Sequence, residues 1–174
     1  MSKTPEANDP VVVRRAAPAD VEVMAKVEAS AQALLESQGV DLAALRMPEG
    51  FEEAATWSLA FVAEIGGEVV GMARLTELTR EVICLDQVST SPRFAGRGVG
   101  RRLLTEVATA CRERGYSAIT GTTFRDVAFN APFYTRLGCV EEPDPHPSMV
   151  QRRRVEQDLG LDELGPRLIM RLPL

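Results

Sequence analysis

Glycines occupy every second position of residues 96–100, between an apolar segment and a stretch with helical periodicity. Glycine has no Cβ, so the backbone can turn tightly there and a ligand can approach it closely. The first amides of the helix that follows have no intrahelical partner, and the helix dipole adds positive potential at that end. With Arg97, Arg101 and Arg102 nearby, the stretch predicts a site for a phosphate or pyrophosphate.

The spacing of this turn does not fit two familiar phosphate-binding loops. A P-loop has a Lys followed by Ser or Thr after its last glycine, and here Arg101 and Arg102 stand in those places. The dinucleotide fingerprint is G-x-G-x-x-G, whereas Gly100 comes one residue early. From the turn alone, a glycine-rich connection without a ligand is the alternative.

The turn resembles the acetyl-CoA loop of the GNAT acetyltransferases, whose pattern is Gln/Arg-x-x-Gly-x-Gly/Ala after a strand and a Pro-containing turn. Residues 95–100 read AGRGVG after Ser91-Pro92, and Ala95 replaces the family's Gln or Arg. The backbone donors are kept, although one side-chain contact to the pyrophosphate is lost. The resemblance implies that acetyl-CoA is bound by the strand end and the loop, namely Val88, Ser89, Thr90, Ala95, Gly96, Arg97, Gly98, Val99, Gly100 and Arg101.

A second segment, NAPFYTRLGC at residues 130–139, resembles the GNAT segment that ends in Phe-Tyr-x-x-Leu-Gly-Phe, with Cys139 in place of the last Phe. In that family the Tyr protonates the leaving thiolate of CoA, so the resemblance implies that Tyr134 is the general acid. A phenol suits this role because it keeps its proton at neutral pH. An ordinary core tyrosine on an amphipathic helix is the alternative. Asn130 is interpreted as a helix cap.

The base that keeps the attacking amine uncharged is left open by the sequence. Asp86 is the first candidate, because a carboxylate in so apolar a strand is costly to bury without a partner or a water-filled cleft. Its alternative role is an ion pair with an arginine such as Arg74 or Arg125. Gln87 could orient the substrate or an adjacent water. Three further carboxylates could act through a water: Glu28, Glu77 and Asp126.

The elements that must position these residues follow from hydrophobic periodicity. Strands are expected at residues 11–15, 59–65, 68–78, 82–90, 116–124, 139–142 and 168–172. Helices are expected at residues 18–39, 100–114, 130–138 and 148–159, with shorter ones at 42–45 and 51–57. This order predicts an α/β fold with a mixed central sheet of about six to seven strands and helices on both faces. It also matches the mostly antiparallel GNAT layout.

The strand at residues 82–90 is expected to lie centrally, because both of its faces carry apolar residues. Simple alternation places Val88 on the face of Cys84 and opposite Ile83. The GNAT strand bulges at the positions of Asp86 and Gln87, and if this strand does the same, alternation cannot say which of the two faces the cleft. Gly71, inside the preceding strand, predicts a bulge or a close approach of another backbone.

Four features outside these motifs receive ordinary structural interpretations. Trp57 and Phe51 are interpreted as core residues, with a substrate-pocket lining as the alternative. The basic run at residues 152–154 is interpreted as a solvated helix face. His146, between two prolines, is expected to be exposed to solvent. The resemblance implies that the acceptor pocket is formed by the first helices and by variable loops.

Composition indicates one soluble globular domain, residues 11–174, behind a disordered tail of residues 1–10. The 174 residues are 45% hydrophobic and 26% charged, and the net charge is −5. This charge argues against a nucleic-acid partner and is compatible with a cationic amine substrate. There is no apolar run long enough for a membrane span and no signal-peptide pattern. The three cysteines, in apolar segments, are interpreted as core thiols of a reducing compartment.

These observations together predict a cytoplasmic N-acetyltransferase that uses acetyl-CoA, without a metal, to acetylate a primary amine of a small molecule. The segment TFRDVAFNAPFYTRLG also resembles a bacterial subgroup of small-molecule acetyltransferases whose substrates are unassigned. A non-catalytic module that senses acyl-CoA is the alternative, since it needs the glycine loop but not Tyr134. A homodimer is possible, as in many GNAT proteins.

Overall fold

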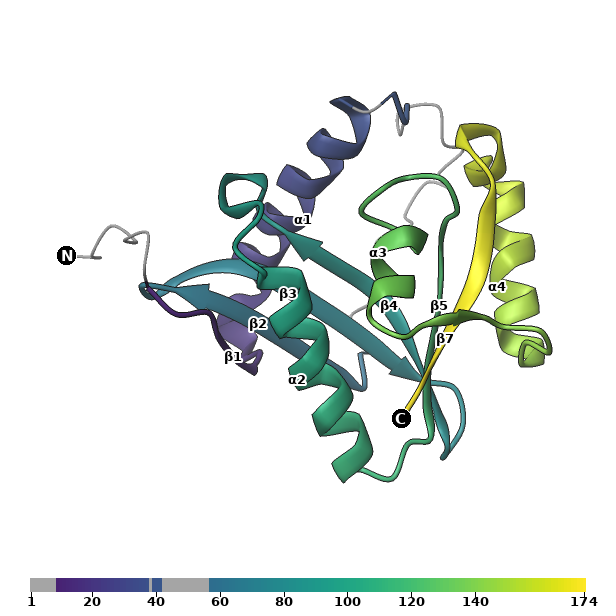
Figure 1. Cartoon of the computed structure of the whole chain (residues 1–174), viewed down its shortest axis with the longest axis horizontal. Coiled ribbons are helices and arrows are strands. Elements are labelled where there is room, and N and C mark those ends of the chain that lie inside the picture. The colour runs from purple at the N-terminus through teal and green to yellow at the C-terminus, as the bar shows by residue number, and fades with distance from the viewer. Residues whose placement is uncertain (1–8, 38, 42–56) are drawn as a thin grey trace.

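The computed structural model describes residues 9–37, 39–41 and 57–174 (Figure 1). Expectations for the tail before residue 9, for Phe51 and for short helices between residues 42 and 56 lie outside these ranges. The strands are β1 (Val12–Arg15), β2 (Leu59–Ile65), β3 (Glu68–Glu77), β4 (Val82–Thr90), β5 (Ala118–Phe124), β6 (Val140–Glu141) and β7 (Arg167–Pro173). The α-helices are α1 (Val21–Ser37), α2 (Val99–Glu113), α3 (Ala131–Arg136) and α4 (Pro147–Asp158). Short 3₁₀ turns precede α1, α2 and β7: η1 (Pro18–Asp20), η3 (Pro92–Phe94) and η4 (Leu161–Leu164).

The described strands form one seven-stranded sheet in the order β1-β2-β3-β4-β5-β7-β6. Only β4 and β5 pair in parallel, and every other neighbouring pair is antiparallel. The predicted fold class, a mixed and mostly antiparallel sheet in an α/β protein, is therefore confirmed. No helix in the described part of the chain is long and apolar enough to cross a membrane.

The helices cover both faces of the sheet. On one face α1 packs its Met24 and Val27 against Val62 and Met72 of the sheet. On the other face α2 supplies the largest apolar cluster, which includes Leu103. Figure 1 shows α2 and α3 in front of the sheet and α1 behind it. The sheet therefore has two covered faces at β4 and β5, and each face carries a different part of the candidate site.

Strand β4 contains a β-bulge at Asp86. Arg74 of β3 lies opposite Gln87, while the next residue of β3 lies opposite Leu85, so Asp86 is the extra residue on β4. A bulge shifts the alternation of side chains by one position. For this reason the prediction for Val88 was wrong: it packs against the same cluster as Ile83 rather than on the face of Cys84.

Gly71 is the point where β3 and the start of α2 approach each other most closely. A Cβ at this position would lie 2.9 Å from Cγ1 of Val99, the first residue of α2. The register of β2 and β3 also shifts beside it, between Ala63 and Glu64. The bulge is confirmed beside this glycine. The close neighbour is the side chain of Val99 rather than another backbone, and this contact holds the start of α2 against the sheet.

Strands β4 and β5 pair over only a short length and then diverge (Figure 1). Their ladder ends where Cys84 lies opposite Thr120. At the fork, a Cβ on Gly121 would lie 3.1 Å from the carbonyl oxygen of Leu85. Glycine therefore lets the two backbones stay close at the base of the fork, and the rest of β4 has no partner strand on the β5 side among the described residues.

Candidate active site

The glycine-rich turn places unpaired backbone donors at the start of α2. Gly96 and Gly98 have positive φ values of 78° and 74°, and Gly98 is the N-cap of the helix. Such left-handed conformations favour glycine over residues with a Cβ. None of the amides of residues 98–101 donates to a backbone carbonyl in the described part of the chain. The anion-binding geometry predicted for this turn is present, and its ligand stays a prediction.

Two amides of the predicted loop are used within the protein. The amide of Ala95 donates to the carbonyl of Pro92 over 3.1 Å, and the amide of Arg97 donates to Phe94 over 3.3 Å. Both bonds tighten the 3₁₀ turn between β4 and α2. The loop donors that remain for a ligand in the described structure are therefore the amide of Gly96 and those at the helix start, beginning at Gly98.

The arginines near the turn are partly engaged by the protein. The Nη2 of Arg97 donates to the backbone carbonyl of Asp9 over 2.9 Å. Arg102 forms an ion pair of 2.8 Å with Glu106, one helical turn further along α2. Arg101 is exposed at the first turn of the helix. In this arrangement the backbone amides and the helix dipole, more than the side chains, define the anion-binding end.

The end of β4 lies beside this helix start. Ser89 is buried, and its hydroxyl accepts a hydrogen bond of 2.8 Å from Nε2 of Gln87. The methyl group of Thr90 lies 3.7 Å from the place where a Cβ on Gly100 would be. The strand end predicted to contact the pantetheine, Val88 to Thr90, is thus adjacent to the predicted pyrophosphate loop.

Helix α3 brings the second motif to the same place. Its Phe133 ring lies 3.4 Å from the position of a Cβ on Gly100, so the helix packs directly on the start of α2. Phe133 also contacts Tyr134 edge to face, with 5.4 Å between the ring centroids. The two motifs, which are about 35 residues apart in sequence, therefore meet in space as the resemblance implies.

Tyr134 is half-buried, and its phenol makes no hydrogen bond to another residue that the structure describes. Burial raises its pKa well above the usual range, and Cys139 raises it further, whereas the positive charge of Arg167 lowers it. The phenol is therefore a proton donor across the pH range in which amines react. Its role as the general acid stays a prediction.

Asp86 is engaged by two donors on the opposite side of the sheet. One carboxylate oxygen accepts from Nη1 of Arg152 over 2.6 Å, and the other accepts from the hydroxyl of Thr76, also over 2.6 Å. Its ion-pair partner is therefore Arg152, and the expected partners Arg74 and Arg125 were wrong. This geometry favours the structural alternative for Asp86, and its role as a base stays a prediction.

The three other candidate carboxylates differ in their surroundings. Glu28 lies 3.1 Å from Nη2 of the buried Arg74. Glu77 accepts a hydrogen bond of 2.5 Å from the hydroxyl of Tyr116, near the start of β5. Asp126 is exposed, and no ion pair or hydrogen bond joins its carboxylate to the other described residues. Among these carboxylates, Asp126 is the one that the described protein leaves available.

Helix α4 is attached to the sheet by a buried ion cluster centred on Glu156. Its carboxylate accepts from Thr122 over 2.5 Å, from Arg153 over 2.7 Å and from Arg167 over 3.2 Å. Burial alone would raise the pKa of Glu156, but Arg167, Thr122 and Arg153 outweigh it, and the pKa lies below its usual value. The predicted solvated face was therefore wrong for Arg152 and Arg153, because this face of the helix packs on β4, β5 and β7.

The cluster continues to the end of β5. The guanidinium of Arg167 lies 4.5 Å from the ring centroid of Phe124, and its Nη2 donates to Thr122 over 3.1 Å. Arg167 thus supports Phe124 from one side of its ring. Trp57, which the sequence assigned to the core, is half-buried and packs against the α1 cluster, and the guanidinium of Arg74 lies 5.1 Å from its ring centroid.

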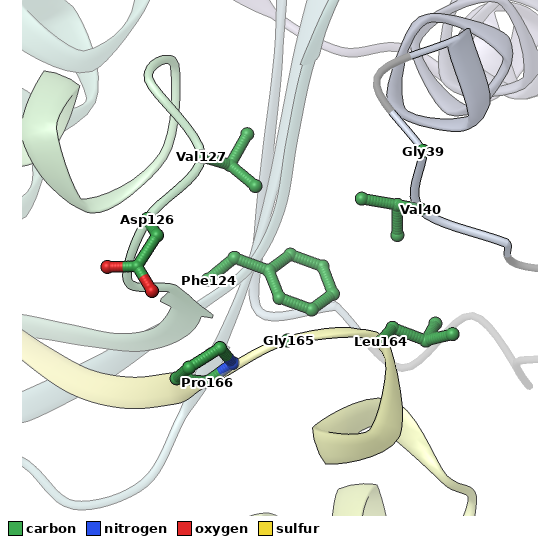
Figure 2. Close-up of a pocket in the computed structure, with 8 residues that line it drawn as sticks. All are labelled: Gly39, Val40, Phe124, Asp126, Val127, Leu164, Gly165 and Pro166. Carbon is green, nitrogen blue, oxygen red and sulfur yellow. The ribbon is translucent and has the colours of Figure 1, made fainter.

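Phe124 also forms the centre of a pocket of about 260 Å³. In Figure 2 its ring lies between Asp126 and Pro166 on one side and Val40 and Leu164 on the other. The lining residues come from three separate segments: Gly39, Val40, Phe124, Asp126, Val127, Leu164, Gly165 and Pro166. Sequence reasoning missed this pocket because none of these segments carries a motif, and only the implied contribution of variable loops pointed toward it.

An open mixed sheet that forks beside a glycine-rich helix start, with a tyrosine-bearing helix packed on that start, is the layout of enzymes that transfer acyl groups from CoA. The chain belongs to the Acetyltransferase (GNAT) family, whose sequence profile matches residues 29–139. The protein is accordingly an acetyltransferase of the GNAT type, and the resemblance stated from its two motifs is confirmed.

Solved structures with the same fold include three that contain a coenzyme. One is N-acetylglutamate synthase from Neisseria gonorrhoeae, complexed with coenzyme A and N-acetyl-glutamate. It is 21% identical to this chain with a TM-score of 0.66, and the match covers 94% of this chain and 35% of that chain. PaiA N-acetyltransferase from Thermoplasma acidophilum, in complex with coenzyme A, is 14% identical with a TM-score of 0.66, over 95% and 99% of the two chains.

A GNAT family acetyltransferase from Elizabethkingia anophelis, with acetyl-CoA bound, is 12% identical with a TM-score of 0.58, over 97% and 100% of the chains. At such identities these likenesses establish the fold and leave the acceptor substrate to be argued from this chain's own residues.

Proposed function

We propose that the protein transfers the acetyl group of acetyl-CoA to a primary amine of a small molecule. The observation that carries this proposal is the convergence at Gly100. The unpaired amides at the start of α2, the end of β4 at Thr90 and the Phe133–Tyr134 pair of α3 all meet there. The fold and two of its coenzyme-bound relatives support acetyl-CoA as the donor.

In this proposal the diphosphate of acetyl-CoA binds the amides of residues 98–101, and the pantetheine arm lies along the open edge of β4 at Val88 to Thr90. A backbone amide of β4 polarises the thioester carbonyl, as in the family. The fork between β4 and β5 leaves this edge without a partner strand in the described structure. The thioester is thereby directed toward the side of the sheet where Tyr134 lies.

The reaction exchanges one bond for another. An ammonium group first loses a proton, and the neutral nitrogen attacks the thioester carbon to form a C–N bond. The C–S bond then breaks, and Tyr134 donates its proton to the departing sulfur. The phenolate recovers a proton from the acetylated nitrogen. The products are an N-substituted acetamide, free CoA thiol and one proton released to solvent.

Calorimetry and thiol release test the proposal. We expect CoA to bind, and free thiol to appear when acetyl-CoA is mixed with a panel of primary amines. If CoA binds but no amine releases thiol, and Tyr134→Phe changes nothing, the protein is the non-catalytic sensor instead. If CoA gives no heat at millimolar concentration, the proposed donor is wrong.

Gly98→Ala should weaken CoA binding by about tenfold or more, because a change of about 1.4 kcal/mol in binding free energy is tenfold. Its φ of 74° strains any residue with a Cβ, and the new methyl group would lie at the helix start where the phosphates approach. Gly115→Ala is a matched control: φ is 86°, nothing lies within 4 Å, and the site is the other end of α2. Equal CoA affinities of the two variants, measured by calorimetry, would contradict the assignment of the loop.

Asp86→Asn should lower thermal stability and reduce kcat by less than about tenfold, because a proton-transfer residue typically contributes 10²-fold or more. The reason is that Asp86 neutralises Arg152 and accepts from Thr76 rather than facing the described pocket. Thermal unfolding and steady-state kinetics check both parts. A loss of kcat near 10³-fold with an unchanged Tm would instead identify Asp86 as the base.

A further inference from the structure

The pocket around Phe124 is connected to Tyr134 by the backbone. The carbonyl of Val127, in the pocket wall, accepts the amide of Asn130 over 2.9 Å. The carbonyl of Asn130 in turn accepts the amide of Tyr134 over 3.0 Å. Because Asn130 directly precedes α3, the loop that lines the pocket also sets the position of Tyr134. The described wall of the pocket is therefore joined to the helix that carries the predicted acid by one short, hydrogen-bonded loop.

The pocket is apolar, small and open to solvent on one side. Val40 and Phe124 are buried, and Val127 and Leu164 are half-buried. Its volume of about 260 Å³ is below the roughly 300–1,000 Å³ of drug-sized ligand pockets. Such walls suit a short alkyl or aryl body, and the hydrophobic effect supplies the affinity.

The charge in the pocket has one sign. Asp126 is the one charged residue among the eight described residues that line it, and no lysine or arginine is among those eight. In Figure 2 the Asp126 carboxylate lies at the edge opposite Val40 and Leu164. Arg167, which stacks on the ring of Phe124, forms an ion pair with Glu156 and is not among the described residues that line the pocket. The pocket is therefore complementary to a molecule with one cationic end and an uncharged body.

We propose that this pocket binds the acyl acceptor, and that the acceptor is a compact primary amine with an apolar body and no carboxylate, held through its ammonium group by Asp126. This inference rests on the proposed acetyl transfer. In the reaction Asp126 accepts the proton that the ammonium loses, directly or through one water, and passes it to solvent. The neutral amine then attacks the thioester as described above.

Two acceptors that differ by one group test the substrate class: 2-phenylethylamine and phenylalanine, which carries an additional carboxylate. We expect kcat/KM for 2-phenylethylamine to exceed that for phenylalanine by at least about tenfold, because a carboxylate beside Asp126 is repelled and finds no cation among the described lining residues. We also expect 2-phenylethylamine to raise the Tm of the CoA-bound protein, a readout independent of turnover. Preference for phenylalanine would overturn the proposal.

Asp126→Asn tests the role of the carboxylate. We expect kcat/KM for 2-phenylethylamine to fall by about 10²-fold or more, because a charged contact and a proton-transfer group are lost together. The advantage of this amine over phenylalanine should shrink with it, while CoA affinity stays the same. Asp144→Asn, an exposed aspartate outside the pocket, is the control and should change neither value. Equal behaviour of the two variants would contradict the assignment of Asp126.

Val127→Arg tests the pocket itself, since a cation in its wall should repel an ammonium group and fill part of the space. We expect KM for 2-phenylethylamine to rise by about tenfold or more with CoA binding unchanged. Suppose that CoA binds, that amines of another class are acetylated, and that Val127→Arg does not change their kinetics. This inference then fails while the proposed function stands. If CoA does not bind the wild-type protein, the proposed function fails first.

Discussion

Tyr134→Phe is expected to lower kcat by about 10²- to 10³-fold, within the range typical of general acid catalysis. The substitution removes one oxygen and keeps the ring, so the edge-to-face contact with Phe133 is retained. Without the phenol, the sulfur must leave as an unprotonated thiolate or take its proton from water. The affinity for CoA should remain within about twofold, since the start of α2 is unchanged.

The two tyrosines of the chain provide a matched pair for this experiment. The hydroxyl of Tyr116 donates to Glu77 near the paired ends of β4 and β5, away from the helix start at Gly98. Tyr116→Phe removes that hydrogen bond and should lower stability by about 1–3 kcal/mol, with kcat unchanged. Comparable losses of kcat in both variants would show that the effect is structural rather than catalytic.

The pH dependence of the reaction gives a second readout. Because burial raises the pKa of Tyr134 far above its usual range, deprotonation of this phenol should not limit the rate below about pH 10. The acidic limb should instead follow deprotonation of the amine, with the assistance of the base. A wild-type alkaline limb near neutral pH that disappears in Tyr134→Phe would contradict this account of the acid.

The parts of the fold that the sequence predicted best depend on short-range patterns. Residues 59–65 were bounded correctly because two apolar runs flank the glycine pair at residues 66 and 67, a strong hairpin signal. The start of α2 was predicted within one residue, because the glycines and the apolar stripe of the helix agree. The meeting of the two motifs at Gly100 could be inferred only through the family resemblance, since spacing alone does not bring α3 to that point.

What the sequence did not predict depends on contacts between distant segments. The bulge at Asp86 changes the face of Val88; the family resemblance raised it, but no local signal within β4 marks it. The face of α4 that carries Arg152 and Arg153 reads as solvated because its partners lie on β4, β5 and β7, far away in sequence. Hydrophobic periodicity indicates which apolar side chains of a helix are buried. It does not indicate that a charged side chain is buried when its ion-pair partner lies on another helix or strand.

Glu156→Ala should destabilise the protein by about 3–5 kcal/mol, the range measured when one partner of a buried ion pair is removed. Glu156 is 8% exposed, and its loss leaves Arg167 with Thr122 and the Phe124 ring as its remaining described contacts. For a chain of this length we expect Tm to fall by roughly 6–20 °C. Asp158→Ala, an exposed change at the end of the same helix, should alter Tm little.

A double variant separates an unpaired charge from a simple loss of packing. Glu156→Gln combined with Arg167→Met removes both charges while keeping similar side-chain volumes, and replacing a buried pair by neutral groups is often nearly neutral. We therefore expect it to be more stable than Glu156→Gln alone and than Arg167→Met alone. A double variant that loses as much as the sum of both single losses would show that the charges do not interact.

The same cluster should make stability depend on pH in the acid range. Since the pKa of Glu156 is lowered in the folded protein, its stabilising effect is fully present above the unfolded value of about 4.5 and is lost as the pH falls through the folded value. Wild-type stability should therefore decrease more steeply below pH 5 than that of the double variant, which has no charge to protonate there. Chemical denaturation at a series of pH values measures this difference, and parallel curves for the two proteins would mean that the charge of Glu156 does not stabilise the attachment of α4 to Arg167.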